Sequence, residues 1–296
     1  MALHTRGMWY MLLATFFFAL MTLLVKLLPG IPVLEIIFFR AVISLSLCLY
    51  GFRRARISPW GNNKTLLAVR GLAGTVSLIQ GYFLVQAIPL AAATTLTHLS
   101  PIFTALIGIW FVREKVTPLQ LAFFGLSFLG VVMIQGFDYR INAGHLLLGI
   151  TTSLTMGIAY NCVRKLGGSE HPLVIIFYFP LVCLPFSALW SALYWVQPQG
   201  LEWLYLILLG LTTQFGQYFM TRAYQVAEIS RVAIINYVEI IFAILFGLLL
   251  FAENYNLLTY TGMGLVVAGV IMNMIYRQKT PVPQLEANAQ PTTTRE

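Results

Sequence analysis

One carboxylate stands inside an apolar stretch of this sequence. Glu239 lies about eight residues into the run from 231 to 252, which corresponds to roughly 12 Å of helix. A carboxylate within a membrane is a functional candidate by default, because burying it in hydrocarbon costs several kcal/mol. It could bind a proton or a substrate, or it could be a protonated side chain that bonds a neighbouring helix and only fixes packing.

An earlier copy of this segment has a serine in the same place. Four residues recur after 139 positions, so that Gly108, Glu114, Gly125 and Gly130 reappear as Gly247, Glu253, Gly264 and Gly269. By the same offset Glu239 corresponds to Ser100, and Asn236 corresponds to Thr97. Residues three apart share one face of a helix. We therefore expect Thr97, Ser100, Asn236 and Glu239 to form two facing polar patches about a pseudo-two-fold axis.

His98 and Arg40 are further candidates within apolar runs. His98 precedes Ser100 by two residues, about 200° around a helix, so only one of the two can point into a narrow cavity. His98 is either a neutral donor to a neighbouring helix or a proton sensor. Arg40 lies some seven residues into its run, so it either binds an anionic or zwitterionic substrate group or ties to carbonyl groups at a helix end. Arg70 is nearer an edge, and we expect it to snorkel toward water.

Two glutamines complete the candidate site. Gln214 and Gln217 share a helix face with Thr221, where they either line a cavity or bridge helices. Glu253, at the end of a run, is expected to cap or lie at the interface, as is its counterpart Glu114. The expected substrate-binding residues are Arg40, Thr97, His98, Ser100, Gln214, Gln217, Asn236 and Glu239, with Glu239 also the proton-coupling candidate.

Other chemistries lack their signatures. The chain contains no HExxH, GxSxG, Walker A or CxxC pattern and no Asp or His cluster, so we expect no catalytic residues, no metal and no cofactor. An ATP-driven pump is excluded for the single chain. The net charge is +8, but the basic residues occur in short clusters between apolar runs, which argues against nucleic-acid binding. The three cysteines lie inside apolar runs and are expected to be core residues.

The composition describes the elements that must hold these residues. Of 296 residues, 59% are hydrophobic and only 9% are charged, which is typical of a polytopic membrane protein. Apolar runs of about 20 residues, the length of a membrane span, predict helices at 8–28, 33–52, 66–87, 90–112, 118–137, 144–165, 172–196, 202–222, 231–252 and 256–276. The polar end from 278 to 296 is predicted to be a disordered cytoplasmic tail.

The basic residues also predict orientation. With the N-terminus inside, fourteen Lys and Arg fall on the inner side and only Lys26 and Arg140 on the outer side, so both termini are expected to be cytoplasmic. Each copy of the repeat, 1–139 and 140–277, holds five predicted spans. An odd number of spans inverts the second copy. We therefore predict an all-α membrane protein of ten transmembrane helices in two inverted five-helix repeats.

Several segments resemble one known family. They are FALMTLLVKLL at 18–28, FFRA at 38–41, PLAAATTL at 89–96, SPIFTAL at 100–106, REK at 113–115 and GLSFLGVVMI at 125–134. Together they resemble EamA-type carriers of the drug/metabolite transporter superfamily, over roughly residues 7 to 277. The resemblance implies ten helices in two inverted units, a central cavity and alternating access for small organic solutes. The second copy departs from it, because Glu239 and Ile240 replace Ser100 and Pro101.

The leading hypothesis is a secondary transporter, not an enzyme, that moves a small organic metabolite by alternating access. It is either proton-coupled through Glu239 or a facilitative exchanger. A membrane enzyme acting on lipid would need paired acids or bases at an interface, and a channel usually repeats its pore lining, whereas Ser100 and Glu239 differ. We expect a neutral or zwitterionic substrate with an apolar body, contacts with membrane lipids, a monomer or homodimer, and location in the bacterial inner membrane.

Overall fold

The computed structural model describes residues 2–111, 117–166, 169–226 and 234–279, and every regular element in these ranges is helical. The elements are α1 (Ala2–Lys26), α2 (Val33–Ala55), α3 (Lys64–Ala87), α4 (Leu90–Thr97), α5 (Ser100–Phe111), α6 (Pro118–Phe137), α7 (Ala143–Leu166), α8 (Pro172–Leu193), α9 (Leu201–Val226), the 3₁₀ turn η1 (Ile234–Tyr237), α11 (Val238–Phe251) and α12 (Leu257–Lys279). Glu114 and the predicted tail from 280 onward lie outside these ranges.

Within the described ranges, six helical stretches are long and apolar enough to cross a membrane, one of which, 90–108, comprises α4 and part of α5. Three shorter apolar segments lie at 118–134, 235–251 and 257–273. Large apolar side chains such as Leu121, Leu249 and Leu257 are exposed on the outside of the bundle. Such a surface suits helices that face lipid, because a helix satisfies its own backbone hydrogen bonds and presents only apolar side chains to hydrocarbon.

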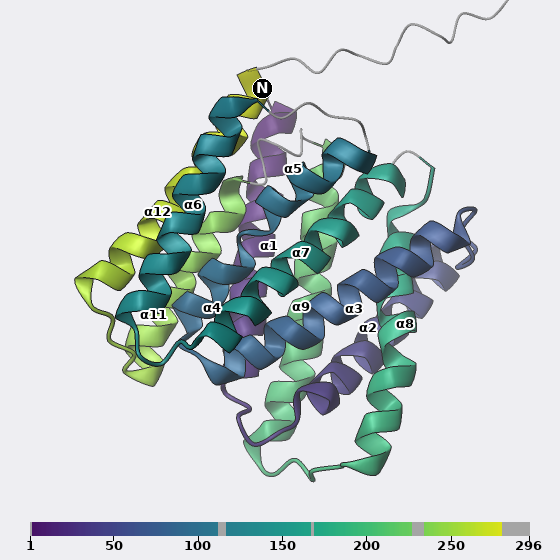
Figure 1. Ribbon diagram of the computed structural model, residues 1–296. Helices are drawn as coiled ribbons and strands as arrows, with labels where there is room; N and C mark the ends of the chain where they lie inside the picture. Colours follow the sequence, from purple (N-terminus) through teal and green to yellow (C-terminus); the bar gives the residue numbers. More distant parts are fainter. Residues whose placement is uncertain (1, 112–116, 167–168, 227–233, 280–296) are drawn as a thin grey trace, which may run out of the picture.

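The helices pair across the two copies of the repeat. Helix α1 packs on α9 and α3 packs on α7, while α2 packs on α8 and α6 packs on α12. In Figure 1 the pair of α6 and α12 forms one side of the bundle, and α2, α3 and α8 form the other. The short helices α4 and α11 contact each other between these pairs.

The span expected at 90–112 is not one helix. Helix α4 ends at Thr97 and α5 begins at Ser100, with His98 and Leu99 in a turn between them. Proline at position 101 has no N–H to donate to the carbonyl group of Thr97, so the regular ladder cannot continue there. The hydroxyl group of Ser153 on α7 lies 2.7 Å from the carbonyl oxygen of Leu96 and 3.1 Å from that of Thr97. A neighbouring helix therefore satisfies the freed carbonyl groups.

The described part of the corresponding segment in the second copy, which lacks the proline, begins with a 3₁₀ turn. The 3₁₀ turn η1 precedes α11, which begins at Val238, so Glu239 stands in the first turn of a helix and not in the middle of one. The range expected to start this span, 231–233, lies outside the described residues.

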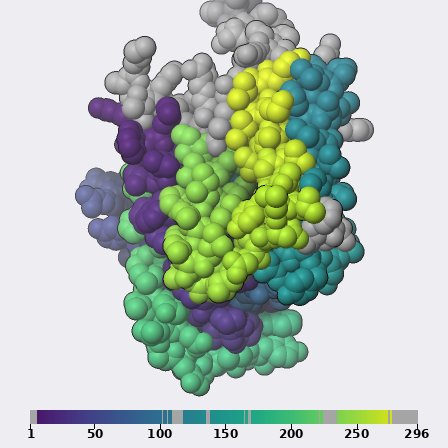
Figure 2. Space-filling model, turned by 90° about the vertical axis from the view of Figure 1, so that its left-hand side faces the viewer, coloured from purple at the N-terminus to yellow at the C-terminus, as the bar shows by residue number. Residues whose placement is uncertain are grey.

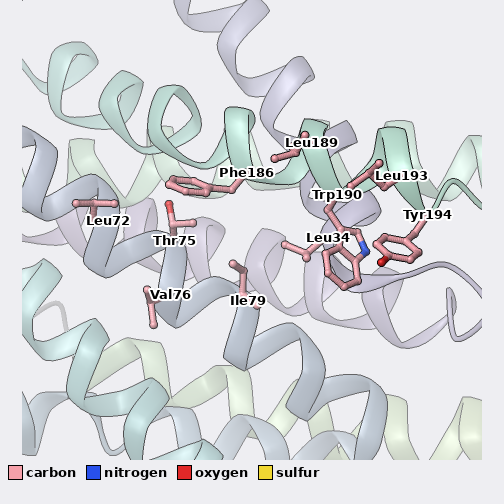
Figure 3. Close-up of a pocket in the computed structure, with 10 residues that line it drawn as sticks. All are labelled: Leu34, Leu72, Thr75, Val76, Ile79, Phe186, Leu189, Trp190, Leu193 and Tyr194. Atoms are coloured by element: carbon pink, nitrogen blue, oxygen red, sulfur yellow. The ribbon is translucent and has the colours of Figure 1, made fainter.

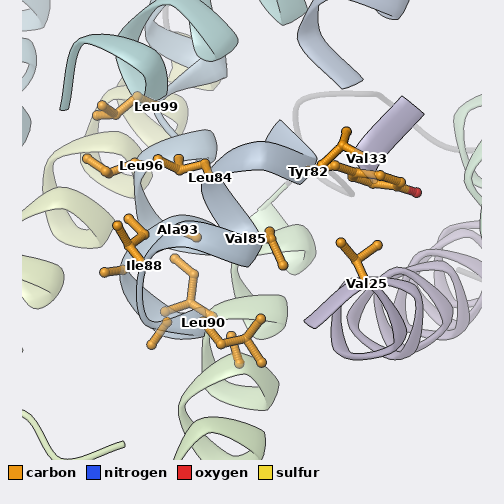
Figure 4. Packing of buried hydrophobic residues seen from close by; sticks show 14 of the residues in the cluster. Val25, Val33, Tyr82, Leu84, Val85, Ile88, Leu90, Ala93, Leu96 and Leu99 are labelled. Atoms are coloured by element: carbon orange, nitrogen blue, oxygen red, sulfur yellow. The ribbon is translucent and has the colours of Figure 1, made fainter. Parts of the chain in front are cut away.

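Helix α4 lies at the centre of the main core. All seven residues from Leu90 to Leu96 are buried, and they pack with Val25, Val85 and Ile88 from the neighbouring segments (Figure 4). The hydroxyl groups of Thr94 and Thr95 donate to the carbonyl groups of Leu90 and Ala91 one turn earlier, so they are buried without an unpaired donor. Thr94 and Thr95 thus face the protein interior.

Helices α6 and α12 cross at glycines. A Cβ atom at position 130 would lie 2.5 Å from the carbonyl oxygen of Gly262, and one at position 269 would lie 2.7 Å from that of Phe123. The two helices therefore touch backbone to backbone. In Figure 2 α12, in yellow, lies along α6, in teal.

Candidate substrate and proton site

Two of the predicted site residues meet where the break between α4 and α5 faces the start of α11. Nε2 of His98, at the break between α4 and α5, lies 3.6 Å from Oε2 of Glu239 at the start of α11. The two side chains are 13% and 15% exposed. A break in the helix positions both groups, because the turn at 98 and the 3₁₀ turn before α11 direct their side chains between the short helices.

The ring of His98 is held at both nitrogens. Nδ1 lies 2.9 Å from the carbonyl oxygen of Thr94, and Nε2 lies 3.1 Å from that of Asn236. Both partners are acceptors, so each contact needs an N–H on the ring. A neutral imidazole carries one N–H and an imidazolium carries two. The geometry can therefore hold a protonated ring, with the carboxylate of Glu239 beside it.

Helix α1 supplies side chains that the sequence did not single out. The hydroxyl group of Thr22 donates to Oε1 of Glu239 at 3.2 Å, and that of Thr15 donates to Oδ1 of Asn236 at 3.4 Å. The hydroxyl group of Tyr237 donates to the carbonyl oxygen of His98 at 3.1 Å. Tyr237 is the counterpart of His98 by the offset of 139, so the repeat could have identified Tyr237 as a candidate neighbour of His98.

Thr97 and Ser100 lie at the same break, and the side chain of Thr97 makes a local contact. The hydroxyl group of Thr97 donates to the carbonyl oxygen of Thr94 at 2.9 Å. Ser100 is buried at the first position of α5. The contacts between the two copies at this break join His98 to Asn236, Tyr237 and Glu239.

Arg40 belongs to a different part of the molecule. It is buried on α2, and its Nη1 donates to the hydroxyl group of Tyr82 on α3 at 3.0 Å. Its guanidinium carbon also lies 5.1 Å from the centre of the Phe179 ring on α8. These contacts are with side chains and not with the helix-end carbonyl groups that one alternative required. Phe179 is the counterpart of Arg40 by the offset of 139, a relation that the sequence could have signalled.

Arg70 does not snorkel. It is 8% exposed on α3, and its guanidinium carbon lies 5.0 Å from the centre of the same Phe179 ring. The expectation that it reaches water is therefore wrong. Gly74, one turn further along α3, leaves room for Phe179, since a Cβ atom at 74 would lie 2.9 Å from a ring carbon.

The two glutamines lie on α9. Oε1 of Gln214 accepts a hydrogen bond of 2.6 Å from the hydroxyl group of Ser44, and its Nε2 lies 3.7 Å from the sulfur of Cys48. Gln214 thus bridges α9 to α2, which was one of its two expected roles. Gln217 is half-buried one turn later.

A charged group caps the buried start of α4. Oε2 of Glu253 accepts hydrogen bonds from the backbone N–H of Leu90 at 2.8 Å and from the hydroxyl group of Tyr255 at 2.8 Å. Oε1 of Glu253 lies 3.5 Å from Nζ of Lys26, which also donates to the carbonyl oxygen of Ile88. The capping role expected for Glu253 is confirmed.

One groove lies apart from these groups. It has a volume of about 510 Å³ between α2, α3 and α8, and its lining includes Leu72, Val76, Phe186 and Trp190 (Figure 3). Thr75 and Tyr194 are the polar side chains in a lining that is otherwise apolar, and none of the predicted site residues is part of it. Its character suits hydrocarbon chains and not a polar cargo.

The model of the EamA-like transporter family matches the chain twice, over residues 5–136 and 143–275. The chain therefore belongs to the EamA-like transporter family, and it is a multi-pass integral membrane protein of the transporter class, not an enzyme.

Named relatives are transporters too. The pseudopaline exporter CntI of Pseudomonas aeruginosa is 31% identical over 272 residues, covering 90% of this chain and 94% of that protein. Human solute carrier family 35 member G1 is 28% identical over 281 residues, covering 88% and 77%. A riboflavin transporter of Brucella anthropi is 27% identical over 260 residues, covering 83% and 89%. A protein crystal structure that is 16% identical matches 94% of this chain with a TM-score of 0.65, which is a likeness of fold alone.

Proposed function

We propose that the protein is a secondary transporter that moves a small organic metabolite by alternating access, with a proton bound and released at Glu239. The observation that carries the proposal is the meeting of His98, at the break between α4 and α5, with Glu239 in the first turn of α11. Interrupted helices at the interface of two repeats are a recurrent way to build a transport site near the membrane midplane.

An inverted two-fold relation between the copies is supported by contacts that come in exchanged pairs. Gly130 packs on Gly262, and its counterpart Gly269 packs on Phe123, the counterpart of Gly262. The lower-numbered end of each helix meets the higher-numbered end of the other, so α6 and α12 run antiparallel. His98 and its counterpart Tyr237 also contact each other, with ring centres 5.4 Å apart. We assign ten spans to two inverted units, 1–139 and 140–277, on this basis.

Alternating access requires one end of the site to close while the other opens. On the side that we place outside, Lys26 joins the end of α1 to Glu253 and to the carbonyl group of Ile88. Gln86 donates to the carbonyl groups of Leu28 and Ile31 on the same side. These bonds tie together the segments that precede α2, α4 and α12, which supports a closed outer end.

Proton coupling rests on the surroundings of Glu239. Its carboxylate has a donor in Thr22 and a ring nitrogen of His98 within 3.6 Å, so a proton can pass between two titratable side chains at one place. The repeat has no second carboxylate there, because Ser100 occupies the matching position. One site that loads and releases one proton is the simplest arrangement that couples a gradient to transport.

The remaining assignments follow from charge and kinship. The fourteen-to-two distribution of basic residues supports cytoplasmic termini, and we assign the chain to the bacterial inner membrane as a monomer or homodimer. Two relatives are named for organic cargo, pseudopaline and riboflavin, which supports an organic metabolite as the substrate class. Arg40, Gln214 and Gln217 remain candidate contacts of that cargo beyond the His98 and Glu239 pair.

The first prediction tests the coupling. A ligand found by its stabilisation of the purified protein is used as cargo in proteoliposomes with an imposed pH gradient. Glu239→Gln keeps the shape of the side chain and removes its proton site, so the variant should lose pH-driven accumulation and retain cargo exchange. Glu202→Gln, a half-buried carboxylate at the start of α9, is the matched control and should accumulate cargo normally. Accumulation by Glu239→Gln at the parent level would rule out Glu239 as the proton site.

A further inference from the structure

Two arginines from different helices lie against one aromatic ring. The guanidinium carbons of Arg40 on α2 and Arg70 on α3 are 5.1 and 5.0 Å from the centre of the Phe179 ring on α8. The distance between the two guanidinium carbons is therefore at most about 10 Å, because both are measured to the same ring centre. Both side chains are buried, with 5% and 8% of their surface exposed.

Two of the three guanidinium nitrogens of Arg70 lack hydrogen-bond partners. Its Nε and Nη1 are buried and make no hydrogen bond, whereas Nη1 of Arg40 donates to the hydroxyl group of Tyr82. The guanidinium of Arg70 lies over the Phe179 ring, and Tyr160, Cys162 and Cys183 are uncharged neighbours close enough to interact with it electrostatically. A buried, charged donor set without an acceptor is costly, and the stacking on Phe179 offsets only part of that cost.

No carboxylate in the described ranges compensates these charges. Each of the six described acidic side chains has a contact elsewhere: Glu35 with the N–H of Val196, Asp138 with Arg140, Glu170 with the N–H groups of Asn62 and Asn63, Glu202 with the N–H of Gln199, Glu239 with Thr22 and His98, and Glu253 with Lys26 and the N–H of Leu90. The pair of arginines is therefore an excess of positive charge inside the fold.

The pair also lies at a depth that suits a transport site. Arg40 is seven residues after the start of α2 and Arg70 is six residues after the start of α3, roughly 10 Å of helix from the end in each case. The two helices are consecutive spans that enter from opposite sides in the proposed topology. Phe179 is the counterpart of Arg40 in the second copy, so the ring and the guanidinium meet near the pseudo-two-fold axis.

We infer that Arg40, Phe179 and Arg70 form a site for a carboxylate-bearing organic anion, the cargo of the transporter; this rests on the proposed function. The planar guanidinium groups match carboxylate oxygens with directed, charge-assisted hydrogen bonds, and the ring between them accepts the carbon skeleton of the ligand. The substrate then supplies the negative charge that the fold lacks. This narrows the cargo from the neutral or zwitterionic solute expected from composition to an anion.

The test uses thermal unfolding of the purified full-length chain at constant ionic strength. The probes are mono-, di- and tricarboxylates, each beside its neutral amide, together with inorganic phosphate and phosphatidylglycerol micelles. A carboxylate should raise the unfolding temperature while its amide does not. Arg70→Met and Arg40→Gln should each weaken that carboxylate at least tenfold, as expected for a lost hydrogen bond to a charged group. Arg53→Gln, an exposed arginine at the end of α2, should bind it like the parent.

A second measurement separates a binding role from a structural one. Met keeps an apolar chain against Phe179 and removes the unpaired charge, so ligand-free Arg70→Met should unfold at the parent temperature or above it. A clear fall in the unfolding temperature of ligand-free Arg70→Met would identify Arg70 as a structural residue and overturn the inference. Stabilisation by phosphate or phosphatidylglycerol but by no carboxylate would overturn it as well.

A transport assay distinguishes a failure of this inference from a failure of the proposed function. If proteoliposomes carry a neutral or cationic solute, and Arg70→Met carries it as fast as the parent, the transporter stands and the anion site falls. If a carboxylate binds through both arginines but no bound solute crosses the membrane, the site stands and the transport proposal falls.

Discussion

The break between α4 and α5 places the His98 side chain close to that of Glu239. Helix ends bring carbonyl groups and side chains into the protein interior, and here both nitrogens of His98 lie within hydrogen-bonding distance of carbonyl oxygens. A side chain held in this way has a defined orientation toward Glu239. The pair is thus positioned by backbone atoms from both copies of the repeat.

A second charged pair lies in the loop after α6. Nε and Nη2 of Arg140 donate to Oδ1 and Oδ2 of Asp138 at 2.8 and 2.7 Å, and Nη2 also donates to the carbonyl oxygen of Asn254. Burial acts to raise the pKa of Asp138, but the hydrogen bonds from Arg140 outweigh it and hold that pKa below its ordinary value. The pair links this loop to the one before α12.

The second prediction follows from the sign of this pKa shift. A carboxylate whose pKa is lower in the folded state stabilises that state above the unfolded pKa, about 3.9, and the contribution is lost as pH falls through the folded pKa. Arg140→Gln should therefore cost about 1 kcal/mol at pH 7, and the difference from the parent should shrink below about pH 4. Thermal unfolding across pH measures it.

The neighbouring Tyr139, which is fully exposed, offers the control for this change. Tyr139→Gln should follow the parent at every pH. If the stability difference between Arg140→Gln and the parent stays constant from pH 7 to pH 3, the pair does not depend on the charge of Asp138.

For single residues, the sequence indicated how far into an apolar run a polar side chain lies, but not which way that side chain points. Glu239 and His98 could be selected because a charge or an imidazole in an apolar run is conspicuous. The rotation of a helix about its axis, and the helix that packs against it, decide whether such a side chain reaches water. Arg70 was misjudged for that reason, since packing of α3 on α8 buries it against Phe179.

Among the elements, the short helices α4 and α5 differ most from the single span that the sequence predicted. The sequence located polar residues and a proline within the run from 90 to 112, and this pattern was compatible with a single helix. The structure divides it at His98, because the carbonyl groups freed there find a donor in Ser153 on α7. A tertiary contact of this kind is not visible in local sequence.

The third prediction concerns the crossing of α6 and α12. Gly130→Ala would place a Cβ atom 2.5 Å from the carbonyl oxygen of Gly262, and backbone atoms cannot move aside as a flexible side chain can. We expect a loss of about 1 to 3 kcal/mol in the free energy of unfolding, the usual result of overpacking. Thermal unfolding of the purified protein measures it.

Gly125 provides a matched control on the same helix, since a Cβ atom there would meet nothing within 4 Å. Gly125→Ala should be neutral or stabilise by up to about 1 kcal/mol, because alanine favours the helix over glycine. Equal losses in Gly125→Ala and Gly130→Ala would contradict backbone contact at the crossing.

For the whole molecule, the pairing of helices across the copies is the feature that makes alternation possible. The contacts of α1 with α9 and of α3 with α7 exchange under the repeat, as do those of α5 with α7 and of α11 with α1. Each copy therefore presents the same surfaces to the other. The proposed alternating access requires a rocking motion of one copy against the other.

The measurement that tests this most directly is the labelling of a cysteine at Thr97 from each side of the membrane. The background replaces Cys48, Cys162 and Cys183, which are all buried, and an impermeant maleimide is added to right-side-out or inverted vesicles. Lys26→Met removes the bonds that close the outer end, so alternating access predicts faster labelling from outside and slower labelling from inside, in step. Labelling that rises from both sides, or changes on neither, would contradict alternating access.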